Sequence, residues 1–203
     1  MPRVSVVNYG VGNLKSVKKG LEKSGAKVLI TDNSKEIAES DAVVLPGVGA
    51  FAPAVKNMAP LSDVLKESVK DGKPLFGICL GLQLLFTTSS EGGSPTSGLD
   101  FISGGIIKLP ENVKTPQMGW NTVDIVKSHP MLEGVPNRSY VYFVHTYVPK
   151  PSEPDVILAT TEYGVKFPSI IGKRNFFATQ FHPEKSSKTG LTILENFVNT
   201  LKR

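Results

Sequence analysis

The segment Pro74-Leu75-Phe76-Gly77-Ile78-Cys79-Leu80-Gly81-Leu82-Gln83-Leu84-Leu85-Phe86 carries the strongest structural signal in the chain. Residues 74–78 form a short apolar run typical of a strand buried on both faces, and residues 80–86 are predicted to form a helix directly after it. Cys79 stands between Gly77 and Gly81 at the junction, which is the pattern of a nucleophile elbow. The start of a helix would also favour a thiolate there. A small buried cysteine beside two structural glycines would give the same pattern, so both interpretations stay open.

Upstream of this segment, apolar runs alternate with amphipathic stretches. We expect strands at residues 4–7, 26–30 and 41–45. We expect helices at residues 13–23, with Asn13 as the cap, and at residues 34–39 and 61–70. Repeated strand–helix units of this kind favour a mostly parallel central sheet flanked by helices on both faces.

Downstream of the segment, the pattern changes. Residues 87–99 are rich in Ser, Thr and Gly and predict a surface loop. Strands are expected at residues 106–109, 121–126, 140–148, 156–161, 169–172 and 176–181, followed by a helix at residues 189–201. The turn signals between these strands favour antiparallel pairing. Because no internal repeat or long linker divides the chain, residues 1–203 are expected to form a single α/β domain with an additional antiparallel region.

The composition is that of a globular protein, with 40% hydrophobic and 20% charged residues among 203. No apolar run approaches the roughly 20 residues that span a bilayer, and the first residues lack the regions of a secretory signal. The net charge of +5 comes mostly from scattered lysines rather than from clustered arginines and aromatics, although attraction of an anionic substrate or acidic partner stays open. We therefore expect a cytoplasmic protein that binds neither nucleic acids nor membranes. One cysteine and no zinc-ligand spacing predict no metal site.

A cysteine nucleophile needs a base, and the chain has three histidines. His129 precedes a proline at an expected helix start and is predicted to be exposed and structural. His145 lies in an aromatic-rich strand, where a hydrogen-bonded core histidine is the more frequent case. His182 follows the last expected strand, and Glu184 lies two residues farther on, where a carboxylate can hold the imidazole in the required tautomer. Cys79, His182 and Glu184 are therefore the predicted catalytic set.

An acyl-transfer site also needs hydrogen-bond donors for an oxyanion. Leu80 offers its backbone N–H at the elbow, and Pro46-Gly47-Val48-Gly49 follows an expected strand and opens on the same edge of the sheet. An ordinary glycine turn is the more frequent explanation for a segment of that composition. Gly10-Val11-Gly12-Asn13 has half of a dinucleotide-binding motif but lacks the third glycine and the acidic partner, so we expect no nucleotide cofactor.

Five segments carry a family resemblance when taken in order: residues 9–14, 45–51, 77–83, 117–121 and 180–186. Together with Cys79 and the later His182 and Glu184, they resemble the class I, triad-type glutamine amidotransferases, and within them the glutaminase subunits of imidazole glycerol phosphate synthase. The resemblance extends from residue 4 to residue 197. It implies a flavodoxin-like fold and a heterodimer in histidine biosynthesis. There, ammonia would pass to a (β/α)₈-barrel cyclase subunit that makes imidazole glycerol phosphate and aminoimidazole carboxamide ribotide.

The resemblance implies a role for each matching residue. Cys79 would attack the side-chain amide of L-glutamine and form a thioester, while His182, oriented by Glu184, would protonate the departing ammonia and activate water. The N–H groups implied at the oxyanion are those of Val48 and Leu80. The residues implied in substrate binding are Gly47, Gly49, Gln83, Thr146 and Tyr147. The residues implied at the cyclase interface are Asn13, Trp120, Lys185 and Ser186, and no cofactor or metal ion is implied.

Three positions depart from the family pattern. Gln117 stands where histidine is common, Val148 where a tyrosine often follows, and Ala178 where glycine is usual. None is a predicted triad member, so we expect these departures to affect the interface rather than the reaction. Three alternatives stay open: a glutaminase of anthranilate, purine or pyridoxal phosphate synthesis, a cysteine hydrolase or peptidase, and a binding module with an inactive site.

Overall fold

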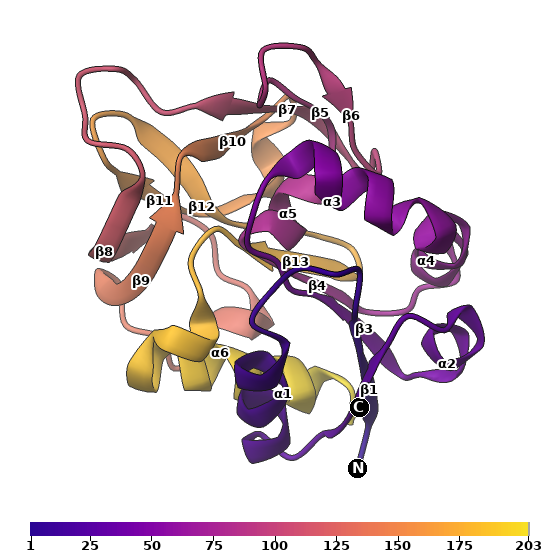
Figure 1. Cartoon of the computed structure of the whole chain (residues 1–203). Helices are drawn as coiled ribbons and strands as arrows, with labels where there is room; N and C mark the ends of the chain where they lie inside the picture. The colour runs from indigo at the N-terminus through magenta and orange to yellow at the C-terminus, as the bar shows by residue number, and fades with distance from the viewer. Residues whose placement is uncertain (203) are drawn as a thin grey trace.

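The computed structural model describes residues 1–202 and places a long mixed sheet at the centre of the molecule (Figure 1). Its strand order is β2-β1-β3-β4-β13-β12-β11-β8-β9. The parallel strands are β1 (Arg3–Val7), β2 (Lys27–Thr31), β3 (Ala42–Leu45), β4 (Leu75–Ile78) and β13 (Phe176–Thr179). The antiparallel extension consists of β12 (Lys166–Lys173), β11 (Ile157–Glu162), β8 (Gln117–Ile125) and β9 (Ser139–His145). The predicted fold class, a mostly parallel sheet with an antiparallel region, is confirmed.

Helices cover both faces of this sheet (Figure 1). One face carries α1 (Leu14–Lys23) and α6 (Ser187–Thr200), and the other carries α2 (Ser34–Glu39), α3 (Phe51–Met58), α4 (Ser62–Lys70) and α5 (Leu80–Leu84). Short 3₁₀ turns lie at Ala59–Leu61, Pro130–Leu132, Pro154–Val156 and Pro183–Lys185 (η1 to η4). Strand residues alternate between the two cores: Val44 of β3 packs with α1 and α6, whereas Val43 packs with α3 and α4. Burial on both faces explains why the parallel strands are almost continuously apolar.

A second, four-stranded sheet has the order β10-β7-β5-β6. Its strands are β5 (Phe86–Ser89), β6 (Thr96–Ser97), β7 (Ile102–Lys108) and β10 (Tyr147–Pro151). The loop predicted for residues 87–99 is therefore wrong at both ends, since β5 and β6 pair with each other and β5 also pairs with β7. Thr88 gains its strand partners from these distant segments, and its own polar neighbourhood carries no strand signal.

The single strand predicted for residues 140–148 is in fact two strands in different sheets. β9 ends at His145 and pairs with β8, whereas β10 begins at Tyr147 and pairs with β7. Thr146 therefore marks the point where the chain crosses between sheets. The hydrophobic alternation continues through the crossing, so the local pattern does not reveal it.

The remaining differences are smaller. The helix α3 is not predicted from the sequence. Its Pro53 occupies the first turn, where a missing N–H costs no helical hydrogen bond. The helix predicted to reach residue 86 ends at Leu84, because Phe86 already belongs to β5. The helices α1, α2, α4 and α6 begin and end within two residues of the predicted bounds. None of the helices within residues 1–202 combines the length and apolar character needed to cross a membrane.

Candidate active site

Cys79 lies in the turn between β4 and α5 with a φ of 53° and a ψ of −105°, a strained conformation for a residue other than glycine. The glycines on either side are required by packing. A Cβ on Gly77 would lie 2.9 Å from the carbonyl oxygen of Gly81, and a Cβ on Gly81 would lie 1.8 Å from that of Leu45. The chain therefore has the backbone geometry of the predicted elbow, and the glycines are structural parts of it.

Three neighbouring parallel strands bring the predicted site residues to one edge of the sheet. β3 leads into residues 46–49, β4 into Cys79, and β13 into residues 180–182. The backbone N–H of Cys79 donates to the carbonyl of Thr179 at 2.8 Å, which joins two of these exits directly. Residues far apart in the chain meet here because the carboxyl ends of parallel strands share an edge.

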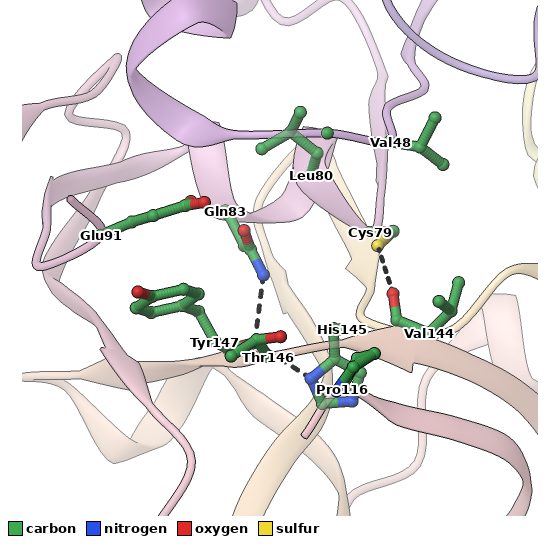
Figure 2. Close-up of a pocket in the computed structure, with 11 residues that line it drawn as sticks. Val48, Cys79, Leu80, Gln83, Glu91, Pro116, Val144, His145, Thr146 and Tyr147 are labelled. Atoms are coloured by element: carbon green, nitrogen blue, oxygen red, sulfur yellow. Dashed lines mark hydrogen bonds between the residues drawn. The ribbon is translucent and has the colours of Figure 1, made fainter.

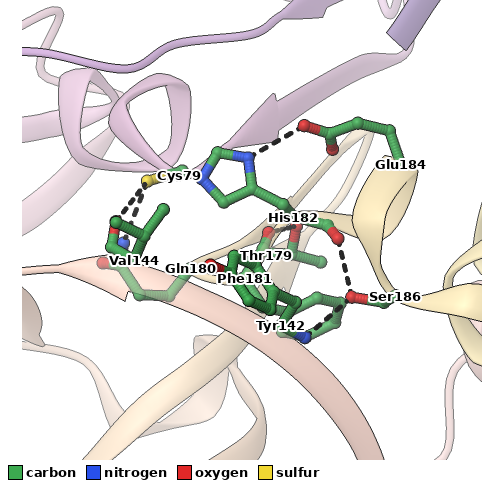
Figure 3. A network of polar contacts seen from close by, with 9 residues as sticks. All are labelled: Cys79, Tyr142, Val144, Thr179, Gln180, Phe181, His182, Glu184 and Ser186. Atoms are coloured by element: carbon green, nitrogen blue, oxygen red, sulfur yellow. Dashed lines mark hydrogen bonds and ion pairs between the residues drawn. The ribbon is translucent and has the colours of Figure 1, made fainter. Parts of the chain in front are cut away.

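His182 and Glu184 lie beside Cys79, and each of the two side chains is only 1% exposed (Figure 3). His182 Nδ1 donates to Glu184 Oε1 at 2.9 Å, since an ionised carboxylate can only accept, and Nε2 points toward Cys79 Sγ. Burial alone lowers the pKa of His182, but the negative charges of a Cys79 thiolate and of Glu184 outweigh burial and raise the pKa to about 10. The structure thus brings the three predicted catalytic residues together and stabilises an imidazolium next to the sulfur.

Ser186 fixes the backbone of His182 to β9. Its hydroxyl donates to the His182 carbonyl at 2.6 Å and accepts from the Tyr142 N–H at 3.0 Å, while the His182 N–H donates to the Tyr142 carbonyl at 3.0 Å (Figure 3). Ser186 is 0% exposed. Its buried side chain therefore holds the His182 backbone in place, and the location of Ser186 near a partner interface stays a prediction.

A cavity of about 250 Å³ opens beside Cys79 (Figure 2). Its lining residues are Val48, Gly49, Cys79, Leu80, Gln83, Glu91, Pro116, Val144, His145, Thr146 and Tyr147. All the predicted substrate-binding residues belong to this lining except Gly47. Gly47 is required by packing, since a Cβ there would lie 2.5 Å from the hydroxyl of Tyr9. The volume suits a small ligand, because the pockets that bind drug-sized ligands measure about 300–1,000 Å³.

Gln83 and Glu91 give the cavity wall its hydrogen-bond acceptors (Figure 2). Gln83 Nε2 donates to the Tyr147 carbonyl at 3.1 Å and to Gln180 Oε1 at 3.2 Å, so its Oε1 is the atom left to accept from a ligand. Glu91 Oε2 accepts from the backbone N–H of Phe51 at 3.0 Å, and its negative charge attracts a cationic ligand group. Glu91 is not among the residues predicted from the sequence, because it lies in a turn after β5, where no local signal marks it.

One of the two predicted oxyanion donors is engaged within the protein. The Leu80 N–H donates to the Gly47 carbonyl at 3.4 Å, so this carbonyl occupies the position that an oxyanion would take. Tyr9 holds the start of the segment 46–49, because its hydroxyl donates to the Pro46 carbonyl. Burial, followed by the charge of Cys79, raises the pKa of Tyr9 and keeps this hydroxyl a donor.

Beyond Gly47, the same segment is open to solvent. Val48 is 38% exposed, and Gly49 has a φ of +116° with open space around its Cα. Glycines on both sides of Val48 allow the peptide group between Gly47 and Val48 to rotate. Its orientation therefore decides whether the Gly47 carbonyl or the Val48 N–H points toward the Leu80 N–H.

The other two histidines have structural environments. His145 is buried, and its Nδ1 donates to the Tyr147 carbonyl at 3.0 Å, as expected for a hydrogen-bonded core histidine. Burial lowers the pKa of His145 to about 4, so the ring is neutral at neutral pH. His129 does begin a short helix, where Nδ1 accepts from the Met131 N–H at 3.2 Å. The prediction that His129 is exposed is wrong, because its ring is half-buried against Phe177 at 5.5 Å between centroids.

The other residues predicted at a partner interface lie at the surface or near it. Lys185 is exposed and directly follows Glu184, while Asn13 is half-buried at the N-cap position of α1, without a side-chain cap bond. Trp120 is 52% exposed, and it shares one side of the β8–β9 pair with Met118 and Tyr140, which are 65% and 63% exposed. We call Met118, Trp120 and Tyr140 the β8–β9 face. An exposed apolar group of this kind is typical of an interaction site.

The three departures from the family pattern are internal. Gln117 and Val148 are 3% and 2% exposed, and Ala178 is fully buried opposite Gly77. Their side chains therefore contribute to the interior around the site. Within residues 1–202, no cluster of three or more His, Cys, Asp or Glu side chains is placed to hold a metal ion.

The family model for glutamine amidotransferase class-I matches residues 5–201 of the chain. The chain belongs to this family. Relatives within the family cover nearly the whole chain. The imidazole glycerol phosphate synthase subunit HisH of Methanocaldococcus jannaschii is 50% identical over 198 residues, which cover 98% of this chain and 100% of that protein. The HisH subunit of Natronomonas pharaonis is 45% identical over 202 residues, covering 97% and 94%. The resemblance identified from the motifs is confirmed.

Solved structures support the fold of the family. The structure of PurLQS from Thermotoga maritima aligns with a TM-score of 0.78 at 15% identity, covering 98% of this chain and 99% of that chain. The glutaminase domain of Trypanosoma brucei CTPS with bound acivicin aligns with a TM-score of 0.69 at 18% identity, covering 98% and 94%. At such low identity, these similarities establish the class-I fold alone.

Proposed function

We propose that the chain hydrolyses L-glutamine to L-glutamate and ammonia, as the glutaminase subunit of an imidazole glycerol phosphate synthase. The observation that carries this proposal is the meeting of Cys79, His182 and Glu184 at a strained elbow beside a small polar cavity. Membership of the class-I glutamine amidotransferase family supports the reaction. The full-length HisH relatives support the choice of synthase over the other open alternatives.

In the first half of the reaction, the Cys79 thiolate attacks the side-chain carbonyl carbon of glutamine, and a tetrahedral oxyanion forms. The His182 imidazolium gives its Nε2 proton to the leaving nitrogen, the C–N bond breaks, and ammonia departs. A γ-glutamyl thioester and a neutral His182 remain. Glu184 keeps the proton on Nδ1 throughout, so Nε2 is always the nitrogen that exchanges protons.

In the second half, neutral His182 takes a proton from water through Nε2, and the resulting hydroxide attacks the thioester. The C–S bond then breaks, glutamate leaves, and the thiolate–imidazolium pair is restored. For substrate binding, Gln83 Oε1 and the Glu91 carboxylate are acceptors that match the N–H groups of glutamine, a charged ammonium among them. Thr146 and Tyr147 also line the cavity, and the Tyr147 carbonyl holds the Gln83 side chain.

The partner of this glutaminase is a (β/α)₈-barrel cyclase that consumes the ammonia. Ammonia released into water becomes ammonium and loses its nucleophilic lone pair, so a closed route between the two active sites preserves its reactivity. The β8–β9 face offers the docking surface, together with Lys185, whose ammonium lies 5.8 Å from the centre of the Tyr142 ring. Lys185 adjoins Glu184, so a partner seated there would cover the side of the molecule next to the triad.

The isolated chain is expected to be a poor glutaminase. With the Gly47 carbonyl on the Leu80 N–H, the oxyanion lacks its donors and the tetrahedral intermediate is not stabilised. Rotation of the peptide before Val48 would replace the carbonyl with the Val48 N–H. We propose that the cyclase with its bound nucleotide favours the rotated orientation.

The deciding experiment measures glutamate release with and without the cyclase subunit and its nucleotide substrate. We expect slow hydrolysis by the chain alone and a large increase when both are added. A Cys79→Ala variant should bind the cyclase normally and retain less than about a thousandth of the activity, the usual cost of losing a triad member. Full activity without a partner would contradict the blocked oxyanion site, and activation only by another synthase would reassign the pathway.

A further inference from the structure

A line of hydrogen-bonding side chains runs from the Cys79 sulfur to the opposite wall of the cavity. Gln180 Nε2 lies 3.7 Å from Cys79 Sγ (Figure 3). Gln180 Oε1 accepts from Gln83 Nε2 at 3.2 Å. Gln83 Nε2 also donates to the Tyr147 carbonyl at 3.1 Å (Figure 2). Gln180 is 0% exposed, so its amide is held entirely by protein atoms. Neither the triad nor the substrate contacts described above use this residue.

The contact with Gln83 determines which way the Gln180 amide faces. The Tyr147 carbonyl can only accept, so the Gln83 group that meets it is the NH₂ group, and the same NH₂ group meets Gln180. Gln180 must therefore present its oxygen to Gln83 and its N–H bonds to Cys79. A buried amide with both ends assigned in this way is a fixed donor aimed at the sulfur.

A hydrogen-bond acceptor also lies next to the Cys79 sulfur. The Val144 carbonyl also lies 3.7 Å from Cys79 Sγ (Figure 3). A thiol can donate to this carbonyl, whereas a thiolate cannot and is repelled by its lone pairs. The Gln180 amide favours the thiolate over the thiol, since an N–H donor forms a stronger hydrogen bond to an anion than to a neutral acceptor. The Gln180 amide therefore opposes the unfavourable effect of Val144 on the thiolate.

We propose that Gln180 is a further catalytic residue, whose amide donates a hydrogen bond to the Cys79 thiolate. This inference rests on the proposed role of Cys79 as the nucleophile. The thiolate exists before the attack and again when the C–S bond of the thioester breaks, so the same donor acts on both halves of the reaction. Gln83 is the positioning residue that holds the donor in place from the substrate side.

The test uses the fact that Cys79 is the only cysteine in the chain, so alkylation by iodoacetamide reports on it alone. The rate of alkylation is measured against pH for the wild type, Gln180→Leu and Gln180→Met. We expect both variants to shift the pH profile upward by about one unit and to slow alkylation about tenfold below its midpoint, as for a lost hydrogen bond to a charged group. The Met variant keeps a flexible side chain of similar volume in case Leu disrupts folding, which thermal melting monitors.

Ser169→Ala is the matched control. Ser169 is buried, and its carbonyl accepts the Gln180 backbone N–H at 2.9 Å, so the substitution alters the same region without removing the donor. It should leave the profile unchanged. A wild-type profile in a folded Gln180 variant would overturn this inference while leaving Cys79 as the nucleophile. An unreactive wild-type Cys79 would overturn both proposals.

Discussion

His182 and His145 are both buried near Cys79, but their pKa values shift in opposite directions. His182 is buried, but the charges of Cys79 and Glu184 raise its pKa to about 10. His145 is buried among the rings of Phe143 and Phe167, and desolvation lowers its pKa to about 4. The difference lies in the neighbours, since no carboxylate pairs with His145 among the contacts of the described residues. One histidine is therefore suited to hold a proton beside the sulfur, and the other to remain neutral.

The depressed pKa of His145 predicts a loss of stability in acid. Between pH 6.5 and about 4 the unfolded chain binds a proton at this residue that the folded chain does not, so the free energy of unfolding falls as the pH falls. The measurement is urea unfolding of the wild type and His145→Gln across this range. The slope of the wild type should be steeper by up to about 1.4 kcal/mol per pH unit. Parallel curves would show that His145 titrates normally.

A control is available in His129. Its pKa is also lowered by burial, with a further effect from Lys127, but its ring is only half-buried. His129→Gln should therefore change the slope less than His145→Gln does. An equal effect of the two substitutions would mean that burial depth does not determine the shift.

The turn between β4 and α5 is the element on which the site depends. It holds Cys79 in a left-handed conformation, and the cost of that conformation is met by close packing of β4, α5 and β3. The Gly81 Cα lies directly against the Leu45 carbonyl, so the helix begins in contact with the neighbouring strand. Any side chain at this point would separate the two elements.

This packing predicts that Gly81→Ala is severely destabilising. A Cβ 1.8 Å from a backbone oxygen cannot be relieved by a side-chain rotation, so the backbone must move, at a cost of about 3 kcal/mol or more in the free energy of unfolding. Gly105→Ala in β7 is the control, because a Cβ there meets its nearest atom at an ordinary 3.5 Å. Urea unfolding of both variants should separate them clearly. Similar stabilities would mean that the turn is looser than described.

The sequence predicts an element well when the element has a periodic pattern of its own. It predicts an element poorly when the element forms only by pairing with other segments. The parallel strands and the helices α1, α2, α4 and α6 have periodic patterns of their own and were predicted within two residues. β5 was missed because its polar residues become a strand only by pairing with β6 and β7. The crossing at Thr146 was missed because the two halves of one apolar run pair with different sheets.

The same distinction applies to the site. Cys79, His182 and Glu184 were predicted from short motifs whose local spacing carries the chemistry. Glu91 could not be found in this way, since it reaches the cavity only through the folding of the second sheet. For Ser186, the family resemblance predicts a place near the interface, and its inward orientation follows only from the packing of η4 against β9.

Across the whole molecule, the exposed apolar residues are unevenly placed. The β8–β9 face lies at one end of the nine-stranded sheet, and β2 lies at the other. Leu29 on β2 is 46% exposed but is not part of that group. The two ends of the sheet thus offer a direct comparison between a proposed docking surface and an ordinary exposed apolar residue.

We predict that Trp120→Ala weakens binding of the cyclase by about 2 kcal/mol or more, as expected for a central interface tryptophan. Leu29→Ala should leave the affinity unchanged. Calorimetric titration of each variant with the cyclase measures both values. Circular dichroism of Trp120→Ala should match the wild type, since the side chain is 52% exposed. Equal affinities of the two variants would remove the β8–β9 face from the interface.

The position of β13 has a consequence for how the protein is made. β13 lies between β4 and β12, so the middle of the sheet is completed only by a strand that leaves the ribosome well after β4. At about 5–20 residues per second, translation from β4 to β13 takes on the order of 5–20 seconds. During that interval the nascent chain carries an unpaired β4 edge that invites mispairing, and a thiol without its imidazole. The nascent chain therefore cannot consume glutamine before β13 and the residues that follow it up to Glu184 have been synthesised.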